Sequence, residues 1–372
     1  KHCKEIIFIV LFLALASSSF ASTKTWLSDN VNLSIGSILF IDTLSGYIGV
    51  NTENPTEKLT LNGGNFLQTA GEPTHEGNVT LRSLGSGMNN LYVSGNYAFV
   101  TEEDYGFSIV DITNPSSPAL IKNYTGGMSP VKGIAVVGRY LYLGEAPIFR
   151  IVDISTISNP IMAGAYSSIN NIQDIYISGK YAYISGDTNS LIILDISSPR
   201  NITPMGTYGS VGSNSVYVSG KYAYLADVNK NFTIVNISDP SNPTLAGKVA
   251  LDTVPYDIYI SGKYAYVIEA DMYNYGWLDI IDISNPSSPF IVSAYFCYDP
   301  RSVFVSGKYA YVTEQYGSGL AGLMILDVSN ASNIRYVTQY LWTALPKKIY
   351  VSGKYAYLTT DIGLEIVDIS GI

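Results

Sequence analysis

The 372-residue chain is 47% hydrophobic and 14% charged, with a formal net charge of −9. It is long enough to bury a large core or several domains. Binding to nucleic acid needs clustered Lys and Arg, and the sequence has no long basic run, so nucleic acid is not an expected partner. Frequent tyrosine (31 residues) and glycine (33 residues) favour β-structure over helix.

The N-terminus has the pattern of a secretory signal. Lys1 and Lys4 precede the apolar run IIFIVLFLALA, and small residues follow it. This pattern predicts a signal peptide over residues 1–21, with cleavage after Ala21. An uncleaved anchor is the alternative, but the run is short for a membrane span. We therefore expect an exported protein without an integral membrane span after cleavage.

Residues 22–77 differ from the rest of the chain. The stretch GYIGVNTENPTEKLTLNG (46–63) resembles short segments of some fibre-like and phage tail surface proteins. The resemblance implies a small β-rich stalk or attachment module through which the chain can form oligomers. The alternative is a linker of lower order.

A repeated phrase organises the remaining residues. VFVSGKYAYV (303–312) is one of seven related copies, and each is followed by a second motif such as LEIVDI (364–369) and, in most copies, by a turn such as SNPSSP (284–289). The copies are aligned on Gly95, Gly138, Gly179, Gly220, Gly262, Gly307 and Gly353, with spacings of 41 to 46 residues. Such a period is typical of β-propeller blades.

Each copy predicts four short strands. They are rich in Tyr, Val and Ile, and Gly, Asn and Pro bound them. The last copy stops after its third strand, and GNVTLRSLGSG (77–87) stands where other copies place their fourth strand. We therefore predict an all-β fold in which residues 78–372 form a seven-bladed β-propeller. A strand at about 78–84 completes the last blade and removes an open edge, which an open β-solenoid would not need.

The motifs FSIVDI (107–112) and LEIVDI (364–369), together with the VSGKYAY phrase, resemble the LVIVD-repeat family. The resemblance covers about four-fifths of the chain. It implies a propeller with a binding or structural role at a bacterial or archaeal cell surface, or as a secreted protein. It carries no catalytic motif to this sequence.

Most catalytic sites are excluded within the ring. The only histidines, His2 and His75, precede it, so a Ser/His/Asp triad, a Cys–His nucleophile and a His-based metal site are not expected there. No dinucleotide or phosphate fingerprint opens a helix, so no cofactor is expected. A pair of carboxylates acting on polysaccharide remains possible. An enzyme is thus the less favoured interpretation.

In six copies, the fifth residue of the second motif is an Asp. Each precedes a turn rich in Ser, Asn and Pro, where a carboxylate can accept backbone N–H bonds. We predict a structural role in the turn, without a metal, for Asp111, Asp153, Asp195, Asp282, Asp327 and Asp368.

The two faces of the ring are predicted to differ. One face, here called the turn face, carries the near-identical SGKY and NPSSP turns. The opposite face, here called the variable face, carries the connections between strands two and three and between blades, which differ among copies. Loops that vary on a rigid scaffold are typical binding elements.

A candidate ligand-binding rim lies on the variable face. An acidic residue follows the second strand in every copy, namely Glu102, Glu145, Asp187, Asp227, Glu269, Glu314 and Asp361. Two enlarged loops and their neighbours add Tyr273, Tyr275, Trp277, Tyr298, Tyr316 and Trp342, with basic residues at Lys132, Arg301 and Lys347. Aromatic rings beside acids suit a sugar, a cationic group or a protein. A solvated acidic rim without a ligand is the alternative.

We therefore expect an exported binding or adhesion scaffold for a surface protein or carbohydrate. One alternative is a polysaccharide hydrolase or lyase that uses Glu269 or Glu314. The other is a purely structural surface-layer module attached through residues 22–77.

Overall fold

The computed structural model describes residues 72–81, 88–102, 106–124, 130–316 and 320–372, together with the backbone of four strands nearer the N-terminus. The predicted signal peptide, residues 1–21, lies outside the described residues. The chain divides into two compact units, Lys1–Thr69 and Ala70–Ile372. Within the described ranges, no helix has the length and apolar character needed to cross a bilayer.

The first unit contains one four-stranded sheet with the order β1-β2-β3-β4. Its strands are β1 (Val31–Ser34), β2 (Ile38–Asp42), β3 (Tyr47–Val50) and β4 (Leu59–Leu61). β3 and β4 pair in parallel, and the other neighbours pair antiparallel. The segment thus contains β-structure, and its role as a stalk or attachment module stays a prediction.

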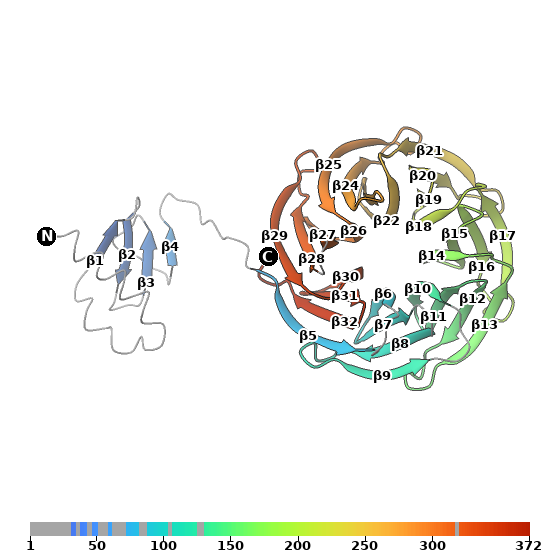
Figure 1. Ribbon diagram of the computed structural model, residues 1–372, viewed down its shortest axis with the longest axis horizontal. Helices are drawn as coiled ribbons and strands as arrows, with labels where there is room; N and C mark the ends of the chain where they lie inside the picture. The colour runs from blue at the N-terminus through green and yellow to red at the C-terminus, as the bar shows by residue number, and fades with distance from the viewer. Residues whose placement is uncertain are drawn as a thin grey trace. The chain divides into compact units, whose positions relative to one another are not determined.

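The second unit is a ring of seven four-stranded antiparallel sheets, as predicted (Figure 1). The first strand of each blade borders the centre of the ring. In blades 1 to 7 these strands are β6 (Met88–Ser94), β10 (Val131–Val137), β14 (Ile172–Ser178), β18 (Ser213–Ser219), β22 (Val254–Ser261), β26 (Pro300–Ser306) and β30 (Pro346–Ser352).

The second and third strands form the middle of each blade. The second strands are β7 (Tyr97–Glu102), β11 (Tyr140–Glu145), β15 (Tyr181–Gly186), β19 (Tyr222–Asp227), β23 (Tyr264–Ala270), β27 (Tyr309–Tyr316) and β31 (Tyr355–Thr360). The third strands are β8 (Gly106–Asp111), β12 (Ile148–Asp153), β16 (Leu191–Asp195), β20 (Asn231–Asn236), β24 (Tyr275–Asp282), β28 (Leu320–Asp327) and β32 (Gly363–Asp368).

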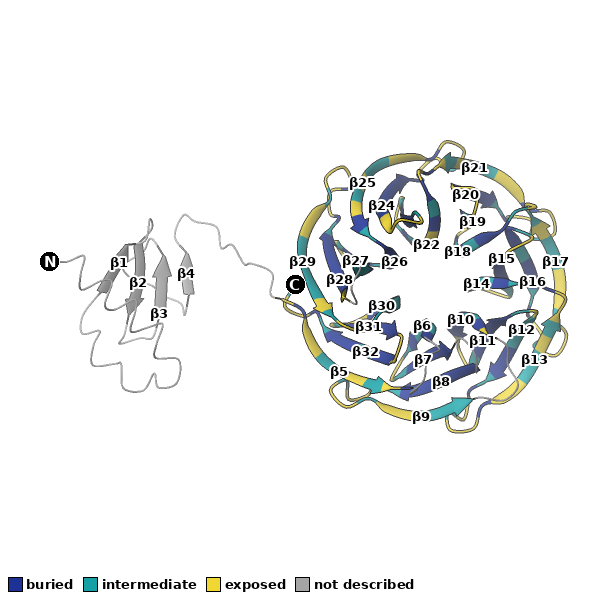
Figure 2. Cartoon of the chain, in the orientation of Figure 1, coloured by how far each residue is buried: buried dark blue, intermediate teal, exposed yellow. Residues whose placement is uncertain are grey.

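The fourth strands form the outer wall of the ring. They are β9 (Ala119–Tyr124), β13 (Ile161–Ser167), β17 (Thr203–Tyr208), β21 (Thr244–Ala250), β25 (Phe290–Tyr298), β29 (Arg335–Trp342) and, in blade 7, β5 (Thr74–Thr80). Figure 2 shows that the middle strands are largely buried, whereas exposed residues gather along the outer strands and at the turns.

The SGKY phrase forms the hairpin between the first two strands of a blade. In blade 6, Ser306 pairs with Tyr309, and Gly307 between them has a φ of +59°. Side chains with a Cβ rarely adopt this left-handed conformation, so the turn requires glycine. All seven aligned glycines have a φ between +56° and +60°. The repetition of the phrase therefore follows from backbone geometry.

Apolar side chains from adjacent blades fill the space between them. Phe99 and Ile109 of blade 1 pack with Ile134 and Leu143 of blade 2, and each is buried. Blades 5 and 6 are joined in the same way through Ile268 and Val312. Successive side chains along a strand point to opposite faces of the blade. Both faces are buried, which explains the nearly continuous apolar sequence of the strands.

The N-terminal strand closes the ring, but its predicted position is wrong by four residues. β5 spans Thr74–Thr80 and pairs with β32 from Asp368↔Thr74 to Gly363↔Thr80. The ring therefore begins before residue 78, and it includes His75, which was predicted to precede it. A Cβ on Gly77 would lie 2.3 Å from the backbone oxygen of Pro115 in blade 1, as one on Gly247 would lie 2.3 Å from that of Pro286. This shared contact sets the register that the sequence alignment missed.

Blades 5 and 6 are taller than the others. β24 has eight residues and β25 has nine, and β27, β28 and β29 have eight each. The corresponding second and third strands of blades 1 to 4 and 7 have five or six residues. The extra residues lengthen the hairpins toward the variable face.

Candidate ligand-binding surface

The aspartates of the turn face fix the turns that follow them. Oδ1 of Asp282 accepts a hydrogen bond from the backbone N–H of Ser284 at 2.8 Å, and Asp327 accepts one from Ser329 at 2.9 Å. Asn236, which replaces Asp in blade 4, accepts the same bond from Ser238 at 3.0 Å. The equivalent bonds, between 2.7 and 2.9 Å, involve Asp111, Asp153, Asp195 and Asp368.

Charges on the turn face have local partners. Lys354 Nζ lies 3.3 Å from Asp368 Oδ2 and 4.9 Å from the ring centre of Tyr355. Lys180 contacts Asp195 at 3.2 Å in the same way. Hydrogen bonds from Ser370 lower the pKa of Asp368. Burial acts in the opposite direction, but its effect is smaller. The same local pairing of a Lys with the turn Asp thus recurs in several blades of this face.

Four of the seven acids of the predicted rim are buried, and not exposed as a binding rim would need. These are Glu102, Glu145, Glu269 and Glu314, whose exposed fractions are between 0% and 2%. Asp187 and Asp361 are exposed, and Asp227 is half-buried.

The buried glutamates have structural partners. Glu269 accepts a bond from the Thr253 backbone N–H at 3.0 Å, and Glu314 accepts one from Tyr298 at 2.8 Å. Asp361 accepts the equivalent bond from Leu345 at 3.0 Å. Each acid thus holds the connection that enters its own blade. Burial raises the pKa of both Glu269 and Glu314.

The other rim acids also bond within or beside their own blades. Glu102 accepts a bond from Ser108 Oγ at 2.7 Å, and Glu145 pairs with Arg150. Asp187 accepts a bond from Gln173 Nε2 at 2.5 Å, which lowers the pKa of Asp187, and Asp227 accepts one from the backbone N–H of Asn229 at 2.8 Å. The seven acids therefore do not converge on one site.

Most of the predicted aromatic residues do come together. Tyr275 lies 6.3 Å from Tyr298, which stacks on Tyr316 of blade 6 with ring centres 5.7 Å apart. Phe296, which the sequence reasoning missed, contacts Tyr275 and Trp277 at 6.1 and 6.2 Å. We call these five residues the aromatic cluster. Phe296 and Tyr275 are 50% and 49% exposed.

Three predicted residues lie outside the aromatic cluster. Tyr273 is 70% exposed at the tip of the β23–β24 connection. Trp342 is partly buried and packs between blades 6 and 7 on a core that includes Leu323. Arg301 lies at the central channel.

A ring of aromatic side chains lines the central channel, and the sequence reasoning also missed it. It runs through successive ring contacts of 4.6 to 5.5 Å. Its members are Tyr92, Tyr176, Tyr217, Tyr259, Phe304 and Tyr350. Ala135 takes the equivalent place in blade 2. These residues border a cavity of about 240 Å³.

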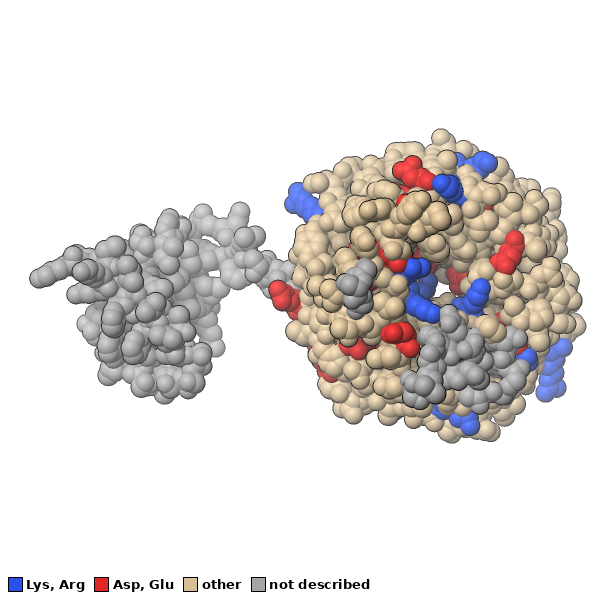
Figure 3. Space-filling model, in the orientation of Figure 1, with Lys and Arg blue, Asp and Glu red and all other residues tan. Residues whose placement is uncertain are grey.

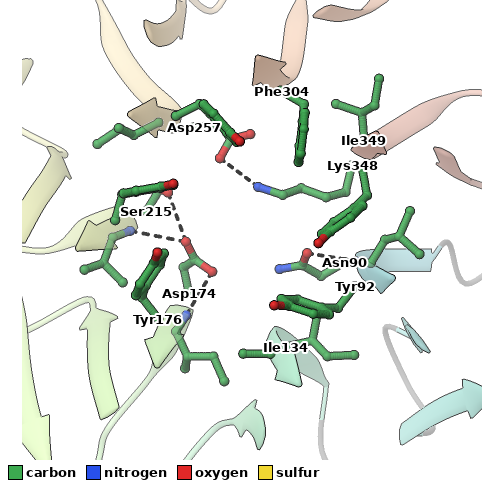
Figure 4. Close-up of a pocket in the computed structure, with 18 of the residues that line it drawn as sticks. Asn90, Tyr92, Ile134, Asp174, Tyr176, Ser215, Asp257, Phe304, Lys348 and Ile349 are labelled. Atoms are coloured by element: carbon green, nitrogen blue, oxygen red, sulfur yellow. Dashed lines mark hydrogen bonds and ion pairs between the residues drawn. The ribbon is translucent and has the colours of Figure 1, made fainter. Parts of the chain in front are cut away.

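A polar layer lies two residues earlier on the same strands (Figure 4). Lys348 Nζ donates to Asp257 Oδ1 at 2.7 Å, from blade 7 to blade 5. Asp257 also accepts bonds from Ser302 Oγ and the Val303 N–H at 2.6 and 3.0 Å. Burial alone would lower the pKa of Lys348, but the charges of Asp257 and Asp174 outweigh burial and raise it.

Asp174 forms an equivalent contact between blades 3 and 4. Its Oδ2 accepts bonds from Ser215 Oγ at 2.9 Å and from the Val216 N–H at 3.2 Å (Figure 4). Burial raises the pKa of Asp174, against the opposing effect of Lys348. The sequence signal was present, because charged residues interrupt a column that elsewhere holds Asn, Gly or Ser.

The channel opens on the variable face into a second cavity of about 200 Å³. Its wall includes Lys132, Arg301 and Lys347, one residue before the polar layer. Figure 3 shows basic side chains beside the central opening of the ring. Lys132 Nζ donates to Gln173 Oε1 at 2.9 Å, and Arg301 pairs with Asp299 at 2.6 Å.

The fold and its repeats define the protein as a β-propeller, a class that provides ligand-binding or scaffold domains. The LVIVD repeat model matches residues 87–126, 130–168, 171–210, 212–251, 256–296, 299–341 and 346–371. The chain therefore belongs to the LVIVD-repeat family. A search of the curated proteins found no match.

Solved structures share the fold at low sequence identity. The β-propeller domain of Cps50 (Swd1) from Myceliophteria thermophila is 12% identical, with a TM-score of 0.62 over 80% of this chain and 99% of that chain. The computationally designed Ika8 protein is 8% identical, with a TM-score of 0.58 over 79% of this chain and 99% of that chain. At these identities, the likeness concerns the architecture alone.

Proposed function

We propose that this protein is an exported binding scaffold, at the cell surface or secreted, and that its ligand is a carbohydrate bound by the variable face. The N-terminal signal pattern supports export. The aromatic cluster is the observation that carries the proposed binding. Single exposed apolar residues are ordinary on protein surfaces, whereas a contiguous group of them marks an interaction site.

The chemistry of the aromatic cluster favours a sugar. Tyr275 and Phe296 are both about half exposed, so their rings can cover the apolar C–H face of a pyranose. Tyr and Trp also offer hydrogen-bonding groups at the edge of an apolar surface. Two tall hairpins from adjacent blades fix these rings, which limits the entropy lost on binding.

The two other functions considered from sequence receive less support. Glu269 and Glu314 are buried, and each accepts a backbone N–H bond, so no observation favours them as a hydrolytic pair. Attachment or oligomerisation through residues 22–77 stays a prediction, and it is compatible with a binding ring.

Affinity electrophoresis of the full chain tests the proposal, with gels that contain the neutral glycans hydroxyethyl cellulose, arabinoxylan or starch. We expect at least one neutral glycan to retard the protein. Tyr275→Ala and Trp277→Ala should each weaken that retardation by about tenfold, which corresponds to about 1.4 kcal/mol, with little change in melting temperature.

Phe290→Ala is the matched control. Phe290 is 56% exposed on the same outer strand, β25, but at its turn-face end. Its loss should leave retardation unchanged. Equal weakening by Phe290→Ala, or no retardation by any glycan, contradicts the proposed carbohydrate site. Binding of a surface protein, but of no glycan, would show that the ligand is a protein and not a carbohydrate.

A further inference from the structure

We infer a second ligand site at the mouth of the central channel on the variable face, which takes a small oxyanion such as a carboxylate- or phosphate-bearing solute. It is a different surface from the aromatic cluster and does not depend on carbohydrate binding there. Four cationic side chains border the mouth, although the whole chain has a net charge of −9. They are Lys132, Arg301, Lys347 and Lys348.

Two acidic residues, Asp174 and Asp257, also border the mouth. Their oxygens already accept hydrogen bonds from the protein, which reduces their repulsion of an anion. Asp257 receives bonds from Ser302 and Val303 of the next blade and from Lys348. Asp174 receives them from Ile175, Ser215 and Val216. Both oxygens of Asp174 and Oδ2 of Asp257 thus face donors of the channel wall, whereas Oδ1 of Asp257 faces Lys348, and each negative charge is partly spread over several donors.

Lys348 provides the deepest contact. One of its three N–H donors reaches Asp257 at 2.7 Å, and its side chain is 27% exposed. Figure 4 shows the side chain extending from β30 toward the middle of the channel. An oxyanion at this depth would accept a charge-assisted hydrogen bond from the ammonium group.

The rim cations complete the site. Lys132 bonds to the neutral amide of Gln173 at 2.9 Å, and the nearest acid that acts on its charge, Asp187, binds the other end of that amide. Arg301 stands 6.0 Å from the ring centre of Tyr256 and pairs with Asp299 through one arm. Because a low-dielectric wall surrounds the opening, these charges attract an anion more strongly than dispersed surface lysines do.

The cavity limits the size of the ligand. The mouth holds about 200 Å³, and the aromatic ring lies below it. Such a volume suits a monosaccharide acid or a sugar phosphate rather than a long polymer. A cationic ligand is the competing case, since Asp174 and an aromatic ring are also present, but Lys348 already supplies a cation there.

Isothermal titration of the full chain with glucuronate, glucose 1-phosphate, glucose and choline tests this site. We expect both anions to bind at low salt, more weakly as salt increases, and glucose and choline to give no signal. A preference between glucuronate and glucose 1-phosphate identifies the favoured anionic group and supports the site in either case.

A charge-matched pair of variants locates the binding. Lys132→Gln/Arg301→Gln/Lys347→Gln should weaken anion affinity by at least about tenfold. The control Lys180→Gln/Lys221→Gln/Lys308→Gln removes the same charge from the turn face and should change affinity by less than about twofold. Neither set includes residues of the aromatic cluster, so retardation by neutral glycans should persist in both.

Three results would overturn the inference. They are no binding of either anion up to about 10 mM, an equal loss of affinity in the two triple variants, and binding as strong as that of the anions by choline, or by glucose in the Tyr275→Ala variant. None of these results affects the test of the aromatic cluster, because that test measures retardation by neutral glycans.

Discussion

The same strands form both faces of this propeller, but the two faces differ in what their residues do. On the turn face, Asp327 and its equivalents fix identical turns, and Lys354 and its equivalents pair with neighbouring Asp residues. On the variable face, blades 5 and 6 extend beyond the others and expose aromatic rings. The positions that repeat satisfy the backbone, whereas exposed aromatic side chains gather where the blades differ.

The acids of the two faces also differ in their electrostatics. Hydrogen bonds lower the pKa of Asp282 and Asp327 on the turn face. Burial raises the pKa of Glu269 and Glu314 near the variable face. The first group stabilises the fold above its unfolded pKa values and loses this effect as the pH falls. The second group destabilises it as the pH rises.

The largest expected effect concerns the closure that both faces share. In Gly77→Val, the new Cβ would lie 2.3 Å from the backbone oxygen of Pro115, and a backbone atom cannot move aside cheaply. Unfolding in urea should show a loss of about 3 kcal/mol. Thr80→Val, at an exposed position of the same strand, should change stability by less than about 0.5 kcal/mol. Equal effects would contradict the role given to this contact.

A smaller effect is expected from a buried acid beneath the aromatic cluster. Burial, with the nearby charges of Glu269 and Asp252, raises the pKa of Asp279 from 3.8 to about 8. Between these values the unfolded chain has released a proton that the folded chain keeps, so stability should fall as the pH rises through this window.

Asp279→Asn removes this penalty. The variant should be more stable than the wild type by about 2 kcal/mol at pH 8, less than the full shift implies because the amide is still polar and buried. The difference should shrink toward pH 4, as thermal unfolding across this range would show. A variant that is less stable at pH 8, or a pH-independent difference, would show that Asp279 is ionised in the fold.

The smallest effect separates hydrogen bonding from charge on the turn face. Asp327→Ala removes the acceptor for the Ser329 N–H and should lower the free energy of unfolding by about 1 kcal/mol. Asp327→Asn should cost less than about 0.5 kcal/mol, since Asn236 makes the same bond in blade 4. If the Asn variant loses as much as the Ala variant, the charge itself matters.

The ring was predictable because its signals are local. The glycine of each hairpin and the Asp two residues before each turn act within a few residues, so a repeated motif identifies them. The position of β5 was not predictable to the residue, because Gly77 is placed by a contact with Pro115, 38 positions away and in another blade.

The candidate site was harder to predict for the same physical reason. The sequence places Glu269 at the end of a strand, but its burial depends on the Thr253 backbone folding over it. Lys348 and Asp257 are 91 residues apart and meet only when the ring closes. Tyr275 and Trp277 were found because they follow an insertion that interrupts the repeat, and Phe296 was missed because the sequence of its outer strand carries no such interruption.

Hydrogen-exchange mass spectrometry of the full chain, with and without a glycan that retards it, tests most directly whether binding belongs to the variable face. The account predicts slower exchange over 271–277 and 294–299, which hold most of the aromatic cluster, and unchanged exchange over the turns 261–264 and 284–289 of the same blade. Slower exchange confined to those two turns would contradict it.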